Sequence, residues 1–296
     1  DCSFISRNFK QADYVERQSG LCELALHNFP LLGLGHIRIH NRDGVSYLQE
    51  MLPVDCLFLD PARRDGHGGK TVAISDCEPD VTVLEPLLVD KAKKVMVKLS
   101  PMLDLSLALN ELKTVRAVHI VAVNNECKEL LLILQKESVS SEVSIHCEHI
   151  VGNGESRHYT FTLKQEKTSP CLLADEVGTY LYEPNAAILK AGAFRSLTQT
   201  YPVAKLHLNS HLYTSVSLVP DFPGRRFRVE AVSGFGKKEL KAFLMDMDKA
   251  NITIRNFPLS VAELRKRLKL KEGGDDYIFA TTLSGGQKVL IRGKKC

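Results

Sequence analysis

The first half of the chain alternates short apolar segments with helical stretches, and this pattern restricts the fold more than any other feature. Residues 12–16, 36–40 and 54–59 have the length and composition of strands, and helical stretches separate them. Parallel strands need such long connections, and the connecting helices then cover both faces of the sheet. The run 54–59 stops abruptly at Asp60, as a strand in the centre of a sheet would. We therefore predict an α/β fold in which residues 54–59 form a buried central strand.

Further strands are predicted along the chain, and the sheet is expected to finish antiparallel. Their residues are 94–99, 117–123, 130–135, 143–150 and 158–164. A polar segment around residues 165–170 then marks a domain boundary. From Gly224 the chain again alternates strands and helices, with one helix expected over residues 237–248, and this pattern predicts a compact α+β unit. The predicted domains are residues 1–165, 166–223 and 224–296.

The composition is that of a globular protein and excludes several other classes. With 44% hydrophobic and 25% charged residues in 296, the chain is neither fibrous nor disordered. Its eight cysteines form no C-x-x-C pair and no Cys/His cluster with metal-ligand spacing, so we expect free thiols in a reducing cytosol and no metal site. No apolar run reaches the roughly 18–20 residues that cross a bilayer, and no signal peptide is recognisable, so a cytoplasmic location without a membrane is expected.

The formal charge of +4 is the sum of two unlike parts. From Gly224 onward the chain has 17 Lys and Arg against 8 Asp and Glu, a net charge of +9, whereas the preceding residues carry −5. A basic domain of this kind suits a polyanion, because Lys and Arg contact phosphates and give an affinity that falls with salt. The alternative is that its basic side chains only face solvent.

Acidic residues follow three of the predicted strands, where ligands bind in open α/β sheets. Glu16 ends the first strand and could accept hydrogen bonds from both hydroxyls of a ribose. Asp43 follows the second strand and could accept from an adenine amine, while Gly44 lets a ligand approach the backbone. Asp60 and Pro61 place a carboxylate and a carbonyl at the end of the third. Taken singly, the alternatives are a solvated strand end, a helix N-cap and a turn.

The order of these segments resembles the motifs of class I S-adenosylmethionine-dependent methyltransferases. The segments are Tyr14-Val15-Glu16-Arg17, Asn41-Arg42-Asp43-Gly44 and Leu57-Phe58-Leu59-Asp60-Pro61-Ala62-Arg63-Arg64. The resemblance implies that Glu16 and Arg17 hold the cofactor ribose, and that Asp43 and Gly44 contact its adenine. It also implies that Asp60 and Pro61 face the methyl group and the acceptor. Asp1 resembles the last acid of the glycine-rich first motif, whose glycines would lie upstream, so we expect the chain as given to bind S-adenosylmethionine weakly.

The second half resembles the remaining domains of one bacterial family of such enzymes. Residues 250–258 and 271–277 resemble a THUMP-like C-terminal domain, and the segment before it resembles the small ferredoxin-like insert of that family. The expected fold is therefore a Rossmann-like class I methyltransferase sheet that lacks its N-terminal part. Small α+β ferredoxin-like and THUMP-like domains are expected to follow it.

The residues expected to contact the acceptor are basic. Ala62 and Arg63 stand where enzymes that methylate base amines have a Pro and an aromatic residue. An Arg can instead stack on a base or hold a phosphate, so substrate contacts are expected from six basic residues. They are Arg63, Arg64, Lys98, Arg265, Lys266 and Arg267. For Lys98 and the last three, an ordinary surface position is the alternative.

Three functions are compatible with these features. The first is S-adenosylmethionine-dependent methylation of RNA, either transfer or ribosomal RNA. The second is a catalytically silent RNA-binding or ribosome-associated protein on a methyltransferase scaffold, which the Ala62-Arg63 pair would favour. The third is a methyltransferase acting on a small molecule or a protein. The oligomeric state and the methylated atom stay open.

Overall fold

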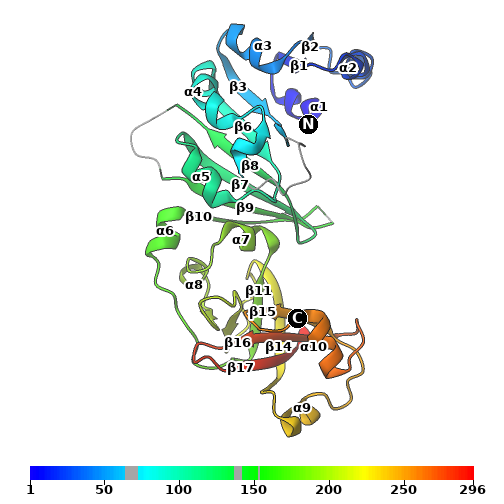
Figure 1. The fold of residues 1–296 in the computed structure, drawn as a ribbon, viewed down its shortest axis with the longest axis vertical. Coiled ribbons are helices and arrows are strands. Elements are labelled where there is room, and N and C mark those ends of the chain that lie inside the picture. The colour runs from blue at the N-terminus through cyan, green and yellow to red at the C-terminus, as the bar shows by residue number, and fades with distance from the viewer. Residues whose placement is uncertain (64–72, 137–141, 153) are drawn as a thin grey trace. The chain divides into compact units, whose positions relative to one another are not determined.

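The computed structural model describes residues 1–63, 73–136, 142–152 and 154–296 (Figure 1). The chain forms two compact units. The first contains Asp1–Val115 and Leu132–Val139, and the second contains Arg116–Leu131 and Ser140–Cys296. Strands β7 (Val115–Val123) and β8 (Glu126–Leu134) have residues in both units.

The first unit begins with a parallel pair of strands. β1 (Ala12–Glu16) pairs with β2 (Ile37–Asn41), and helix α2 (Ser19–Leu31) connects them. The register places Glu16 opposite Asn41. Because the two strands run in the same direction, their carboxyl ends share one edge of the pair, where the sequence predicted a ligand site.

A second parallel pair follows in the same unit. β3 (Val54–Leu59) pairs with β6 (Ala92–Leu99), and helix α4 (Val81–Lys91) leads into β6. Leu59 lies opposite Val97, so the residues that follow β3 lie beside the end of β6. Shorter elements complete the unit: α1 (Cys2–Ile5), η1 (Ser6–Asn8), α3 (Gly44–Glu50), β4 (Ala62–Arg63), η2 (Ile74–Asp76), β5 (Cys77–Glu78) and α5 (Leu105–Glu111).

The prediction of a buried central strand over residues 54–59 is wrong. Strands β9 (Ser144–Ile150) and β10 (Ser156–Thr162) complete a six-stranded sheet in the order β10-β9-β7-β8-β6-β3, so β3 is its last strand. β1 and β2 form a separate sheet, and no other described strand bonds to the outer edge of β3. Its apolar side chains are consequently only partly buried. The expected antiparallel finish is confirmed, because β10 is antiparallel to β9.

The second unit contains a seven-stranded sheet in the order β12-β13-β11-β14-β17-β16-β15. Its strands are β11 (Tyr180–Pro184), β12 (Ala204–Lys205), β13 (Tyr213–Ser215), β14 (Gly224–Ser233), β15 (Asn251–Arg255), β16 (Asp276–Thr282) and β17 (Lys288–Lys295). Its helices are α6 (Leu163–Thr168), α7 (Ala186–Ala191), α8 (Leu197–Thr200), α9 (Lys237–Phe243) and α10 (Val261–Leu268). α9 ends at Phe243, and it could not have reached the predicted residue 248, because Asp246 adopts a left-handed backbone conformation with φ 62° that a helix cannot continue through.

Apolar side chains are buried on both faces of this sheet. Alternate residues of a strand point to opposite faces, and along β16 Ile278 belongs to one apolar cluster while Phe279 belongs to the other. Helices α9 and α10 contribute Phe243 and Leu264 to the first cluster. Leu181 of β11 contributes to the second. Strands before and after Gly224 thus share one sheet and one core.

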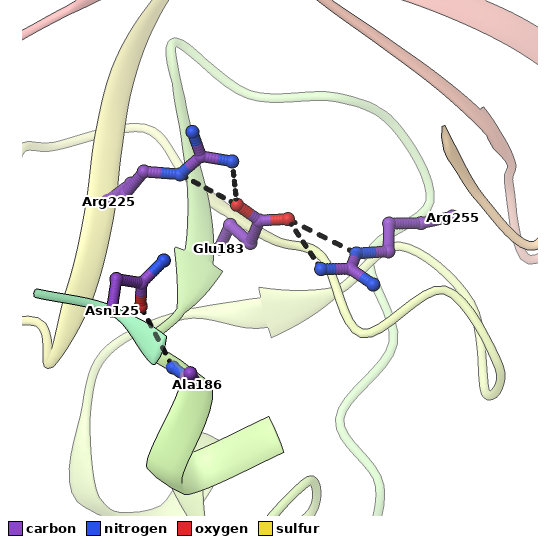
Figure 2. A network of polar contacts seen from close by, with 5 residues as sticks. All are labelled: Asn125, Glu183, Ala186, Arg225 and Arg255. Carbon is purple, nitrogen blue, oxygen red and sulfur yellow. Dashed lines mark hydrogen bonds and ion pairs between the residues drawn. The ribbon is translucent and has the colours of Figure 1, made fainter. Parts of the chain in front are cut away.

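A buried carboxylate links β11, β14 and β15 (Figure 2). The Glu183 side chain is 3% exposed and accepts hydrogen bonds from both arginines drawn beside it. Arg225 donates from Nε at 2.8 Å and also from Nη2, and Arg255 donates from Nε at 3.1 Å and Nη2 at 2.9 Å. Nearby, the Asn125 side-chain oxygen accepts from the Ala186 backbone N–H at 2.9 Å.

The contact between Glu183 and Arg255 requires a strongly curved sheet. Three strands lie between β11 and β15 in the sheet order. Neighbouring strands are spaced about 4.8 Å apart, so a flat sheet would separate these two by roughly 19 Å, beyond the combined reach of Glu and Arg side chains. The ion pair therefore ties the interior strand β11 to the edge strand β15 in a sheet that curves around the apolar cluster containing Phe279.

Replacing Glu183 with Ala should lower the free energy of unfolding by about 3 kcal/mol, because two guanidinium groups would lose their shared buried partner. The control is Glu126→Ala, which removes a side chain that is 72% exposed in its ion pair with Lys128 and should change stability by less than about 1 kcal/mol. Urea denaturation of both variants measures the difference. Equal, small losses would show that the buried network does not stabilise the sheet.

A second buried polar group lies near Phe194. The Lys205 side chain is only 2% exposed; its Nζ donates to the Leu208 carbonyl at 2.5 Å and lies 5.1 Å from the centre of the Phe194 ring. His211 stacks on the same ring with 3.6 Å between ring centres, and its Nδ1 is buried without a partner among the described residues. Burial, with Lys205 and Arg255 nearby, lowers the pKa of His211 from 6.5 to about 4.

The His211 pKa predicts a loss of stability in mild acid. Between pH 6.5 and 4 the unfolded chain binds a proton at His211 that the folded chain excludes, so the free energy of unfolding falls as pH drops through this window, by up to about 3 kcal/mol. His211→Asn tolerates the left-handed backbone (φ 53°) and removes the titrating ring. Urea titrations should show a shallower pH dependence for this variant. Parallel curves would contradict the pKa assignment.

Candidate functional site

Three of the residues predicted from the sequence meet at the carboxyl end of β6. The Lys98 ammonium lies 2.5 Å from Asp1 Oδ2 and 2.7 Å from Asp60 Oδ2. Lys98 belongs to β6 and Asp60 directly follows β3, so the parallel pairing of these strands brings the two side chains together. Lys98 is 19% exposed, whereas Asp1 and Asp60 are 43% and 52% exposed. The ammonium thus lies beneath two solvent-accessible carboxylates.

This arrangement fixes the orientation of Asp60. Lys98 bonds to Oδ2, so Oδ1 can accept a hydrogen bond from a further N–H or O–H group. Pro61 follows immediately and is half-buried, and its carbonyl is a second acceptor at the same strand end. A carboxylate and a carbonyl on consecutive residues can orient an amine or hydroxyl, and the carboxylate can receive its proton.

Glu16 and Asn41 lie together at the ends of β1 and β2. The Glu16 Oε1 atom accepts from the Gln18 backbone N–H at 2.7 Å, which holds the carboxylate at the strand end. The Asn41 side-chain amide donates to the carbonyls of Glu16 at 3.0 Å and Arg17 at 3.1 Å. Sequence reasoning assigned no role to Asn41; its position directly after an alternating strand was the available signal. The second Glu16 oxygen can accept from a ligand hydroxyl, as a ribose would require.

Asp43 caps a helix, which is the role that the sequence suggested as the alternative to an adenine contact. Its Oδ1 accepts from the Ser46 backbone N–H at 2.9 Å and the Ser46 hydroxyl at 3.0 Å, at the start of α3. These hydrogen bonds from Ser46 lower the pKa of the Asp43 carboxyl. Apart from the chain neighbours of Gly44 and the backbone of its own helix, no atom of the described residues lies within 4 Å of the position that a Cβ of Gly44 would occupy, so the backbone there is open to a ligand. The cap leaves Asp43 Oδ2 as the oxygen that could contact an adenine amine.

The remaining predicted residues of this unit lie elsewhere or outside the described structure. Arg17 pairs with Glu78 at 3.3 Å on the surface. The backbone of Arg63 pairs with Cys77 between β4 and β5. Arg64 lies outside the described residues.

The three basic residues predicted on helix α10 differ from one another. The Arg265 side chain is 22% exposed, and its Nη1 donates to the Ala250 carbonyl at 3.1 Å, so it helps to hold the fold. Lys266 and Arg267 are exposed. The Arg267 guanidinium lies 5.3 Å from the centre of the Phe235 ring.

The hydrogen-bond acceptors at the strand ends fit parts of S-adenosylmethionine. A carboxylate at the end of β1 suits ribose hydroxyls, and an acceptor beside an open glycine suits an adenine amine. Among the residues that the structure describes, no group of three or more His, Cys, Asp or Glu side chains is arranged to hold a metal ion. Within the same residues, no helix combines the length and apolar character of a membrane span.

Comparisons with known proteins identify both halves of the chain. Family models match residues 180–223 as a ferredoxin-like domain and residues 224–295 as a THUMP-like domain. Among solved structures, the chain is similar to a crystal structure of a protein from Porphyromonas gingivalis W83 that is provisionally described as a methyltransferase. The identity is 33% and the TM-score 0.86, and the match covers 99% of this chain and 80% of the other. A search of curated proteins found no match.

Replacing Lys98 with Met should loosen the first residues of the chain, because Lys98 bonds to Asp1 as well as to Asp60. Hydrogen–deuterium exchange of residues 2–8 should become faster, and the free energy of unfolding should fall by about 1 kcal/mol. Lys93→Met is the matched control, since Lys93 lies on the same strand and its side chain is 82% exposed in its pair with Asp55. Unchanged exchange in the Lys98 variant would contradict the described contact.

Proposed function

Because the chain belongs to the family of methyltransferases that carry ferredoxin-like and THUMP-like domains at the C-terminus, we propose that it transfers a methyl group from S-adenosylmethionine to RNA. The observation that carries this proposal is the meeting of Asp60 with Lys98 at the ends of two parallel strands. It is the type of site where α/β sheets bind ligands. The +9 charge from Gly224 onward supports a polyanionic acceptor.

In this proposal the strand ends of β1 and β2 hold the nucleoside part of the cofactor. Glu16 would accept from the ribose hydroxyls through the oxygen that does not bond to Gln18, and Asn41 keeps this strand end fixed. Asp43 and Gly44 would contact the adenine, and Arg17 would contribute a positive charge nearby. The bound cofactor supplies an electrophilic methyl group on a sulfonium.

The acceptor would be oriented by Asp60 and Pro61. Asp60 Oδ1 would accept a hydrogen bond from the acceptor N–H or O–H and would take its proton during the transfer, in which the sulfur–methyl bond breaks and its electron pair stays on sulfur. Lys98 holds the other oxygen of Asp60. The Pro61 carbonyl accepts a second hydrogen bond and fixes the direction of the attacking lone pair. Arg63 and Arg64 would contact a phosphate or the plane of a base.

Asp60→Ala in full-length protein should reduce methyl transfer to RNA at least about 100-fold, since the proton acceptor and its orientation are lost together. Incorporation of a labelled methyl group from S-adenosylmethionine into bacterial RNA measures the activity. Asp55→Ala is the matched control, because Asp55 is an exposed carboxylate on the preceding strand that pairs with Lys93, and it should retain activity.

Three outcomes separate the competing functions. Full activity of the Asp60→Ala variant would show that Asp60 is not the proton acceptor. RNA binding without transfer by the wild-type protein would favour the silent RNA-binding protein, which the Ala62-Arg63 sequence also suggests. Transfer to a protein or small molecule, together with no RNA binding in a salt-titrated shift assay, would favour the third function.

A further inference from the structure

Two phenylalanines and an arginine form a stack at the surface of the second unit. The rings of Phe235 and Phe257 stack with 5.2 Å between their centres and 28° between their planes. The Arg267 guanidinium lies over the Phe235 ring, 5.3 Å from its centre. The three residues come from three separate segments: the turn before α9, the loop after β15 and the last turn of α10. Both rings pack against the apolar cluster that contains Leu264 but are only partly buried.

The turn that carries Phe235 is hydrogen-bonded to the Glu239 side chain. Glu239 Oε2 accepts from the Gly236 backbone N–H at 2.9 Å. A Cβ at Gly234 would lie 2.9 Å from this oxygen, and a Cβ at Gly236 would lie 2.7 Å from it, so a side chain at either position would displace the Glu239 carboxylate from the turn. The Phe235 ring itself is oriented by its contacts with Phe257 and Arg267 before any ligand binds. An aromatic side chain that is already oriented loses little entropy on binding.

The charge around this stack suits a polyanion. Helix α9 begins directly after the turn and carries Lys237, Lys238 and Lys241, all exposed. Lys266 and Lys269, beside Arg267, are also exposed. Two acids of these helices, Glu239 and Glu263, accept hydrogen bonds at the N-terminus of their own helix.

We propose that Arg267, Phe235 and Phe257 form a stacking platform for an unpaired base of single-stranded RNA, with the neighbouring lysines contacting the flanking phosphates. A guanidinium that lies over one ring can stack on a base with its other face. A paired base in a duplex has both faces covered by its neighbours, so the platform selects single strands. The proposal rests on the proposed function, because it assumes that RNA is the acceptor.

Fluorescence anisotropy with a labelled single-stranded RNA of about ten nucleotides measures the platform directly. Arg267→Gln should weaken binding about tenfold, the effect of losing one stacked base together with one charge. Arg267→Lys keeps the charge and should still weaken binding about fivefold. Lys266→Gln is the matched control; it removes one exposed charge from the same helix turn and should weaken binding only about twofold. A duplex of the same sequence should bind more weakly than the single strand.

Equal effects of the Arg267→Gln and Lys266→Gln changes would overturn the proposal, since only charge would then matter. Wild-type affinity of the Arg267→Lys variant, or equal binding of single-stranded and duplex RNA, would overturn it as well. These comparisons use exposed residues of a folded helix, so loss of the fold is not expected.

A fluorescent reporter provides a second readout. The chain contains no tryptophan, so Phe235→Trp introduces a single indole that can keep the contact with Arg267. Its emission should be quenched when the RNA binds, because a base then stacks on the guanidinium that covers the indole. The same reporter in an Arg267→Gln background should respond several times more weakly. Binding of RNA without quenching would place the RNA elsewhere and overturn the proposal.

The platform and the proposed function can fail separately. If the Asp60→Ala variant loses methyl transfer but binds RNA with wild-type affinity, RNA binding by the platform does not depend on the catalytic site. If Arg267→Gln binds and methylates RNA like the wild type, only the platform is wrong. If the protein binds no RNA at all, the platform is wrong and RNA is not the acceptor, whereas methyl transfer to another acceptor can still be measured.

Discussion

The buried carboxylate of Glu183 is the contact on which the second unit depends. It accepts hydrogen bonds from Arg225 on the neighbouring strand and from Arg255 at the far edge of the same sheet. A buried Glu183 carboxylate without a partner would destabilise the fold. Its pairing with Arg255 requires the sheet to curve, and the ion pair in turn stabilises the curved sheet. The contact also joins the ferredoxin-like segment to the THUMP-like segment, because Glu183 lies in the first and both arginines lie in the second. The two small domains therefore form one structural body.

In the first unit, the ion pairs of Lys98 orient a carboxylate that faces solvent. Lys98 is largely covered by protein and binds two carboxylates that face solvent, so it orients Asp60 without neutralising the whole strand end. Glu16 and Asp43 are held in the same way by one or two hydrogen bonds, from Gln18 and from Ser46, and each keeps an oxygen for a ligand. The carboxylates at the strand ends are thus held in place as hydrogen-bond acceptors. Recognition of a nucleoside, and of an amine or hydroxyl, requires acceptors that are positioned in this way.

The sequence predicted the order of the elements well, because hydrophobic periodicity and strand-ending acids are local signals. The meeting of Lys98 with Asp60 could be suspected only from the rule that parallel strands share a ligand-binding edge. The edge position of residues 54–59 could not be predicted, since the run is as apolar as a central strand and its neighbours are set by the whole sheet. The Glu183 network and the stack of Phe235 on Phe257 could not be predicted for a similar reason. Their members are separated by more than 20 residues, and only the folded sheet brings them together.

The central claim is that the strand ends of the first unit bind S-adenosylmethionine. Isothermal titration calorimetry of full-length protein with S-adenosylmethionine tests it most directly, with Glu16→Ala as the site variant and Glu50→Ala, an exposed acid that pairs with Arg42, as the control. We expect micromolar binding by the wild type and the control, and binding at least about tenfold weaker by the Glu16→Ala variant, which lacks the ribose acceptor. No heat of binding at high micromolar cofactor, or equal affinity of the Glu16 variant, would contradict it.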